Sequence, residues 1–186
     1  MNDDACSAAL SAVTTKRSGG RVTDVMIARR ATKDDADAIA AIYNQGIEEG
    51  IATFETRLRT ANDVKKWFDD RFPIVVVENG GRVVGFASTS EYRRRECYAG
   101  IAEFSVYVSR SARGHGAGRL AMQSLMEEAR VAGFWKLVSR VFPENTASRV
   151  LLQRTGFREV GIYKRHAQSR GTWRDVVIVE RLLTEP

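Results

Sequence analysis

Hydrophobic and polar residues alternate regularly near the middle of the chain. Over residues 103–109, Phe104, Val106 and Val108 alternate with other side chains. A period of two is typical of a β-strand. After the glycine-rich residues 113–118, apolar side chains recur from Arg119 onward at the spacing of an amphipathic helix. The centre of the chain therefore predicts a strand, a glycine turn and a helix in succession.

The other elements follow from the same two periods, from capping residues, and from proline and glycine. Strands are expected over residues 25–30, 74–78, 82–90, 135–142, 157–163 and 173–183. Helices are expected over residues 36–47, from Thr60 to the segment before Pro73 (with Val64, Trp67 and Phe68), and over 146–154. Residues 1–24 show no sustained period and are expected to form a disordered extension, leaving one domain over residues 25–186. This order predicts an α/β (mixed α+β) fold, a central mixed sheet of about six to seven strands flanked by about four helices.

The glycine turn is a candidate anion site. Gly114, Gly116 and Gly118 leave backbone N–H groups uncovered, and the turn leads into a helix N-terminus, where free N–H groups favour negative charge. Neither the Lys-Ser/Thr ending of a P-loop nor the glycine spacing of a dinucleotide fingerprint is present. The pattern that remains after these two are excluded is Arg113-x-x-Gly116-x-Gly118. It also fits a strand-to-helix turn that binds no ligand.

The composition restricts the class of binding partner but does not identify a particular partner. The 186 residues are 44% hydrophobic and 28% charged, which is typical of a globular domain, and the net charge of +6 suits an anionic ligand. Because basic residues cluster only at residues 93–95, a small anion is favoured and no nucleic-acid partner is expected. Two cysteines and two histidines lack metal-ligand spacing, so no metal is expected. No apolar run suggests a membrane span and no leader is evident, so we expect a cytoplasmic protein.

From about residue 26 to residue 183 the chain resembles a GCN5-related N-acetyltransferase (GNAT), and within it the phosphinothricin acetyltransferase branch. Besides the glycine turn, the resemblance rests on several segments taken together. They are Tyr43-Asn44-x-x-Ile47, Ala52-Thr53-Phe54-Glu55, Glu103-x-Ser105-Val106-Tyr107-Val108, Gly133-Phe134, Asn145-x-x-Ser148, Gly156-Phe157 and Gly171-x-Trp173-x-Asp175-Val176. Residues 103–145 are most similar to the arsinothricin-resistance acetyltransferases.

The resemblance implies acetyl-CoA as co-substrate and Glu103 as the general base, acting directly or through water. It implies cofactor binding by Val106, Tyr107, Val108, Arg113, Gly114, His115, Gly116, Ala117, Gly118, Arg119, Asn145 and Ser148. The residues themselves allow other roles. Glu103 also fits a strand glutamate paired to an arginine, Arg113 a surface arginine, and Asn145 a helix N-cap.

The expected substrate is a small amino acid with a second anionic group. Arg93 and Arg95 are candidates to bind such groups, with Phe54 and Tyr98 as pocket walls, although a solvated charge run and core packing explain them as well. Some relatives in the branch carry a histidine where this chain has Arg170, a further candidate for a substrate anion. His166 lies four residues away, so a histidine partner for Glu103 is not expected.

Three functions remain open. The first is acetylation of the α-amine of a phosphinothricin- or arsinothricin-like amino acid, conferring resistance. The second is acetylation of methionine sulfone or sulfoximine, of amino acids broadly, or of protein N-termini. The third is an acetyl-CoA sensor without turnover, which Glu103 argues against. A homodimer is expected from the family resemblance alone.

Overall fold

The computed structural model describes residues 25–184; the expected extension over residues 1–24 lies outside the described part. The strands are β1 (Ile27–Arg30), β2 (Ile74–Asn79), β3 (Arg82–Glu91), β4 (Ile101–Val108), β5 (Lys136–Val141), β6 (Arg158–Ser169) and β7 (Thr172–Leu182). The helices are α1 (Ala36–Glu49), α2 (Ala61–Lys65), α3 (Ala117–Val131) and α4 (Thr146–Arg154), with short 3₁₀ turns at Lys33–Asp35, Glu96–Tyr98 and Arg110–Ala112.

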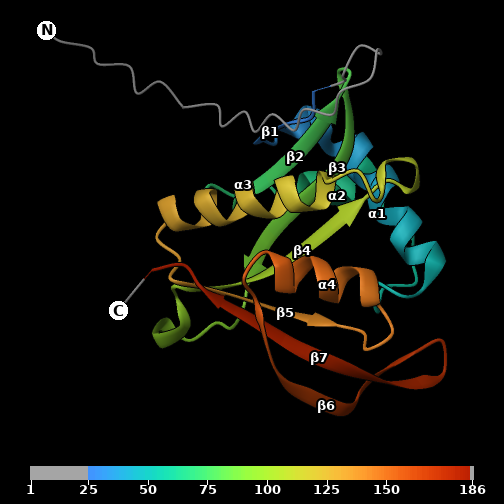
Figure 1. The fold of residues 1–186 in the computed structure, drawn as a ribbon, viewed down its shortest axis with the longest axis vertical. Coiled ribbons are helices and arrows are strands. Elements are labelled where there is room, and N and C mark those ends of the chain that lie inside the picture. Colours follow the sequence, from blue (N-terminus) through green and yellow to red (C-terminus); the bar gives the residue numbers. More distant parts are fainter. Residues whose placement is uncertain (1–24, 185–186) are drawn as a thin grey trace, which may run out of the picture.

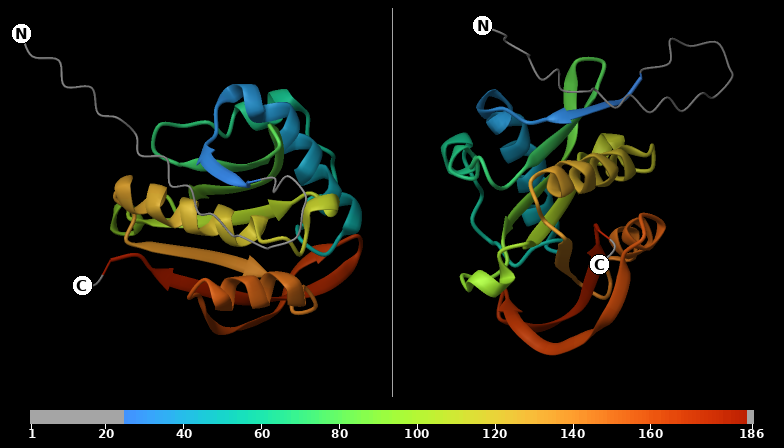
Figure 2. Two further views of the ribbon diagram at one scale, coloured as in Figure 1. Left: turned by 45° about the horizontal axis from the view of Figure 1, so that its top comes forward. Right: turned by 90° about the vertical axis from the view of Figure 1, so that its left-hand side faces the viewer.

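All seven strands belong to one sheet in the order β1-β2-β3-β4-β5-β7-β6 (Figure 1). Neighbours are antiparallel except β4 and β5, which are parallel. That parallel pair is short: it joins residues 101–103 to residues 136–138 and then ends. The sheet is therefore held together at the start of β4 and divided beyond Glu103, with β1–β4 on one side and β5–β7 on the other (Figure 2).

Helices cover both faces of the sheet (Figures 1 and 2). On one face α3 and α4 pack against the strands in a core that includes Phe104, Leu125 and Leu152. On the other face α1 and α2 enclose a second core, which includes Ile39 and Phe86. The alternation along β4 follows from this arrangement, because Phe104 faces the first core while Tyr107 packs against the second.

The predicted fold class and the order of elements are confirmed. The second helix is shorter than predicted, since α2 ends at Lys65 and Trp67 lies beyond it. Trp67 packs edge-on against Tyr43, with the ring centroids 5.3 Å apart. This core contact, and not a place on a helical face, therefore explains why an apolar residue occupies this position.

Residues 164–172, which lie between the last two predicted strands, belong to a long hairpin. β6 runs on to Ser169, which pairs with Thr172 of β7. The two residues between them, Arg170 and Gly171, have φ values of 50° and 77°. Positive φ at both positions is the geometry of a two-residue type I′ turn, which asparagine-glycine usually signals. Because arginine occupies the first position in place of asparagine, the sequence did not predict this turn.

Candidate active site

The divergence of β4 and β5 opens a cavity of about 600 Å³ between the two halves of the sheet. One wall is β4 from Phe104 to Val108. The facing wall is formed by β5 from Ser139 to Val141 and by Phe142, the residue that follows this strand. Along this part of β4 the edge toward β5 has no strand partner among residues 25–184, whereas the other edge pairs with β3 as far as Val108. Backbone N–H and C=O groups that no strand pairs need other hydrogen-bond partners. This edge can therefore bind the amide groups of an extended ligand.

The glycine turn closes one end of the cavity. Gly116 is the N-cap of α3 with a φ of 95°, a conformation that side chains rarely adopt. A Cβ atom built on Gly114 or Gly116 would meet no atom of the described residues within 4 Å, so the space that they leave beside the backbone is open. Free N–H groups at the start of a 15-residue helix face a concave, accessible surface there. This geometry fits a pyrophosphate group.

The predicted cofactor residues come together at this cavity. Every one of them lines it except His115, which is exposed in the turn. Arg113 is held by an ion pair, with its Nη2 3.0 Å from Glu49 Oε2, and also donates to the Val108 carbonyl at 3.2 Å. Its position is therefore fixed by α1 and β4. Binding by these residues remains a prediction that their placement supports.

Asn145 has two structural roles at the cavity rim. Its Oδ1 accepts a hydrogen bond from the Ser148 N–H at 3.1 Å, so it is the N-cap of α4. Its Nδ2 donates to the Ile51 carbonyl at 3.2 Å. Asn145 thus ties α4 to the segment after α1, and its side chain has few donors left for a ligand.

Tyr107 fastens the same segment from β4. Its hydroxyl donates to the Ala52 carbonyl at 3.1 Å, and its ring packs edge-on against Tyr43 at 4.8 Å. Burial raises the pKa of the Tyr107 phenol, so the group stays a neutral donor. Ile51 and Ala52, which sequence reading did not assign to the site, thereby form part of the cavity wall.

Glu103 stands where β4 and β5 separate, at the last residue of β4 that pairs with β5. Its side chain is 26% exposed, and its Oε1 lies 2.5 Å from Arg140 Nη1. Burial raises the pKa of the Glu103 carboxyl, while the positive charges of Arg140 and His166 oppose that rise. Glu103 does not line the cavity; it adjoins the cavity through Phe104 and Arg140, which do. A carboxylate with a raised pKa beside a cavity is suited to accept a proton.

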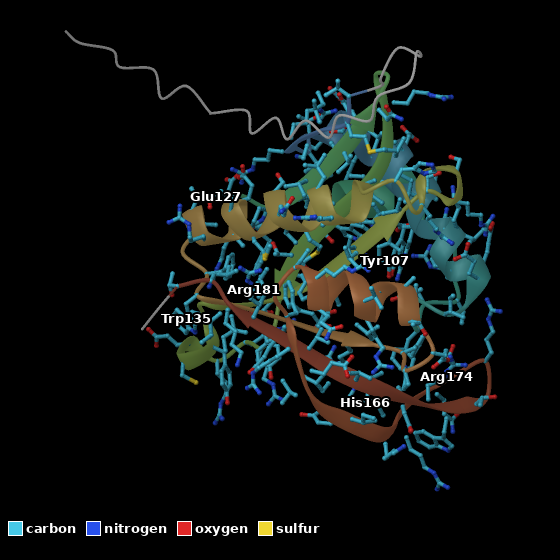
Figure 3. All side chains as sticks on the ribbon, viewed as in Figure 1. Tyr107, Glu127, Trp135, His166, Arg174 and Arg181 are labelled. Carbon is cyan, nitrogen blue, oxygen red and sulfur yellow. The ribbon has the colours of Figure 1, made fainter. Side chains whose placement is uncertain are left out.

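His166 lies closer to Glu103 than the sequence suggests. The expectation that Glu103 has no histidine partner in catalysis stays a prediction, although the charge of His166 lowers the pKa of the carboxyl. The reason is the long hairpin, which carries His166 and Arg174 on neighbouring strands (Figure 3). Arg174 lies 4.6 Å from the centre of the Phe142 ring and forms an ion pair with Glu144.

The predicted substrate residues are dispersed, and none of them lines the cavity. Phe54 contacts a lining residue, since its ring is 4.8 Å from that of Phe142, and it lies 6.3 Å from the ring of His166. Arg93 is exposed and lies over the rings of Tyr92 and Tyr98 at 5.3 and 5.8 Å. Their substrate roles remain predictions.

Two further arginines complete the predicted substrate set. Arg95 is exposed at the N-cap of the 3₁₀ turn Glu96–Tyr98. Arg170 donates from Nη2 to the Ile47 carbonyl at 2.9 Å, at the C-terminal end of α1. That contact satisfies a helix-end carbonyl and gives Arg170 a structural role that sequence reading did not foresee.

Arg140 is the main site residue that sequence reading missed. Alternation along residues 135–142 places Arg140 and Phe142 on one face of their strand, and this signal was available. Its meaning depends on the neighbour, because only the parallel pairing of β5 with β4 brings Arg140 to Glu103.

Within residues 25–184, no group of three or more His, Cys, Asp and Glu side chains is arranged to hold a metal ion. No helix in that range is both long and apolar enough to cross a membrane.

Comparisons with known proteins agree on the fold and the chemistry. Residues 39–157 match the acetyltransferase (GNAT) family. The L-methionine sulfoximine/L-methionine sulfone acetyltransferase of Pseudomonas aeruginosa is 35% identical over 82% of this chain and 91% of its own length. The crystal structure of a ribosomal-protein-alanine N-acetyltransferase from Brucella melitensis is 35% identical, with a TM-score of 0.79 over 84% of this chain and 99% of the other.

A phosphinothricin acetyltransferase from Sinorhizobium meliloti, solved in complex with acetyl-CoA, is 27% identical. Its TM-score is 0.79, over 87% of this chain and 92% of the other.

Proposed function

This chain belongs to the acetyltransferase (GNAT) family, and on that premise we propose that it acetylates the α-amine of a small amino acid carrying a second anionic group. The candidate substrates are phosphinothricin and arsinothricin, whose acetylation would confer resistance. The observation that carries the proposal is Glu103, a half-buried carboxylate with a raised pKa at the point where β4 and β5 diverge. A sensor without turnover would have no need of such a base.

The residues present fit acetyl-CoA. The open turn at Gly114 and Gly116 suits its pyrophosphate, and the unpaired edge of β4 suits its amide-containing arm. When bound there, acetyl-CoA supplies a thioester carbonyl carbon that an amine can attack.

The protein's part in the reaction is to bind, orient and remove a proton. An α-amine is largely protonated at neutral pH, since its pKa is near ~8. Glu103 accepts the ammonium proton, directly or through a water molecule, which frees the nitrogen lone pair for attack. Attack of the amine on the thioester carbonyl would form the C–N bond and break the C–S bond, and the second proton that the nitrogen loses would pass to the leaving sulfur, so that CoA leaves as the thiol. Phe54 and Phe142, in edge-on contact at 4.8 Å, form an apolar wall at the cavity, which Phe142 lines.

Two other substrates are supported by specific relatives. The 35% identical Pseudomonas protein is named for methionine sulfoximine and methionine sulfone, which have a tetrahedral sulfur centre. The 35% identical Brucella protein is named for ribosomal-protein alanine, which would need an open groove for a polypeptide. Because arsenic, phosphorus and sulfur centres present similar oxygens, a guanidinium can accept any of them.

The test is release of free CoA with arsinothricin, phosphinothricin, methionine sulfoximine, ordinary amino acids and an N-terminal alanine peptide offered in parallel. We expect one tetrahedral-oxyanion amino acid to be preferred at least ~100-fold in kcat/KM, which corresponds to about 2.7 kcal/mol of transition-state stabilisation. Equal turnover of all amino acids would contradict the resistance role. Preference for the peptide would move the assignment to protein N-termini.

We propose a homodimer that acts in the cytoplasm, where acetyl-CoA is available. β6 is an edge strand that pairs with β7 alone among the described strands, and nearly all of it is exposed. Its apolar residues Val160, Ile162 and Tyr163 are 48–55% exposed, and a long exposed apolar edge tends to associate. Sedimentation should give twice the monomer mass, and Ile162→Lys should shift the protein toward monomer.

A further inference from the structure

The ion pair between Glu103 and Arg140 crosses the opening of the sheet. Glu103 is the last residue of β4 that pairs with β5, and its partner there is Val138. Arg140 lies two residues further along β5, beyond the last pair, and its guanidinium reaches back to the carboxylate. Arg140 also lines the cavity, which Glu103 does not. Arg140 therefore adjoins both the Glu103 carboxylate and the cavity.

The pair is made through one nitrogen and one oxygen. Arg140 Nη1 is 2.5 Å from Glu103 Oε1, and within residues 25–184 the Arg140 guanidinium makes no second hydrogen bond. A guanidinium has five N–H donors and binds a carboxylate or phosphonate best through two of them at once. The Arg140 guanidinium thus keeps donors for a second anion.

Two other arginines close to the cavity already have partners. Arg174 is paired with Glu144 and stacked on Phe142, and Arg113 is paired with Glu49. The charges that act on Glu103 are Arg140 from β5 and His166 from β6. Of the two, only Arg140 is hydrogen-bonded to the carboxylate. An anion that binds Arg140 would therefore compete directly with Glu103.

We propose that Arg140 holds Glu103 before the amino-acid substrate binds and then transfers this hydrogen bond to the anionic group of that substrate. This inference rests on the proposed function. Its consequence is that the correct substrate activates its own base, because a partly buried carboxylate that loses its cationic partner binds a proton more tightly. Amines without an anionic group would leave Glu103 paired and would react slowly.

The experiment follows the Glu103 carboxyl itself by ¹³C NMR, with glutamate labelled at Cδ and the signal assigned by its loss in Glu103→Gln. It is titrated in the wild type, Arg140→Gln and Arg140→Lys, each with and without phosphinothricin. Acetyl-CoA binding by calorimetry establishes that each variant is folded. The matched control is Arg174→Gln, which removes a nearby guanidinium that does not act on Glu103.

In the wild type, phosphinothricin should raise the pKa of Glu103. In Arg140→Gln the pKa should be raised already, phosphinothricin should not raise it further, and phosphinothricin should bind about tenfold more weakly or worse. Arg140→Lys should restore the substrate-free pKa while binding phosphinothricin less tightly than the wild type. Arg174→Gln should titrate like the wild type.

The inference is overturned if Arg140→Gln titrates like the wild type, or if phosphinothricin raises the pKa equally in both. It is also overturned if phosphinothricin does not bind. Its failure is distinguishable from failure of the proposed function. Turnover of an anionic amino acid with an unresponsive Glu103 would refute the transfer alone, whereas absence of turnover on every amino acid would refute the function.

Discussion

Arg170, at the tip of the β6–β7 hairpin, donates from Nη2 to the Ile47 carbonyl at the C-terminal end of α1, 2.9 Å away. The contact joins residues 123 positions apart. It ties the second half of the sheet to the helix whose end, with Ile51 and Ala52, lines the cavity. The wall of the cavity thus depends on a hydrogen bond that joins the β6–β7 hairpin to α1.

Arg170→Ala should lower the free energy of unfolding by about 1 kcal/mol and weaken acetyl-CoA binding, because one hydrogen bond to a helix end is lost. Alanine keeps the cost of the positive φ at this position, so the side chain alone is tested. Urea unfolding and calorimetry measure the two effects. A higher KM for the amino acid with unchanged stability would instead support the predicted substrate role.

Glu103→Gln should lower kcat by roughly 10²- to 10⁴-fold, the usual contribution of a general base. Acetyl-CoA affinity should change little, because Glu103 does not line the cavity. Stopped-flow kinetics and calorimetry give the two numbers. Unchanged turnover would remove Glu103 from the mechanism.

The acidic limb of the kcat profile should lie above the ordinary glutamate pKa of about 4.3. Burial is the main cause, since it raises the pKa of Glu103 against the charges of Arg140 and His166. The base must be ionised, so activity should fall as pH drops through this raised value. His166→Gln removes one opposing charge and should move the limb to higher pH. A limb that does not move in His166→Gln would show that this charge does not reach the base.

Gly116→Ala should weaken acetyl-CoA binding by about tenfold, with kcat nearly unchanged. Alanine at a φ of 95° costs roughly 1–2 kcal/mol and distorts the N–H groups that start α3. The matched control is Gly81→Ala, a hairpin glycine with a φ of 75° and nothing within 4 Å of its Cβ position. It carries similar strain away from the cavity, so it should reduce stability without changing acetyl-CoA affinity.

Asp35→Asn should lower the free energy of unfolding by about 2 kcal/mol at pH 7. The buried Asp35 carboxylate accepts from both Nη atoms of Arg29 at 2.8 Å and from the Thr32 N–H at 2.8 Å. The Arg29 hydrogen bonds hold its pKa below the ordinary value. Its stabilisation should therefore be complete above the unfolded pKa of about 3.9 and be lost as pH falls through the lower folded value.

Urea unfolding between pH 7 and pH 2 checks this prediction, with the exposed neighbour Asp34→Asn as control. If Asp35→Asn and Asp34→Asn have equal effects, the Arg29 contact contributes little.

The sequence by itself determined the order of elements and the place of the glycine turn. Both are local properties: alternation at Phe104, Val106 and Val108 defines a strand, and glycines before an apolar helix define a turn at its N-terminus. Even the N-cap at Asn145 depends on a residue only three positions away. Most of the predicted cofactor residues lie on these local motifs, which is why they gather at one cavity.

Only the tertiary structure decided what surrounds Glu103. Arg140 reaches it because β5 pairs in parallel with β4, across 37 residues of chain. His166 acts on it because the Arg170–Gly171 turn extends the last hairpin. The same turn commits Arg170 to α1, although its sequence position suggested a substrate contact. A charged side chain takes its role from the nearest opposite charge or free carbonyl, and long-range strand pairing sets which group that is.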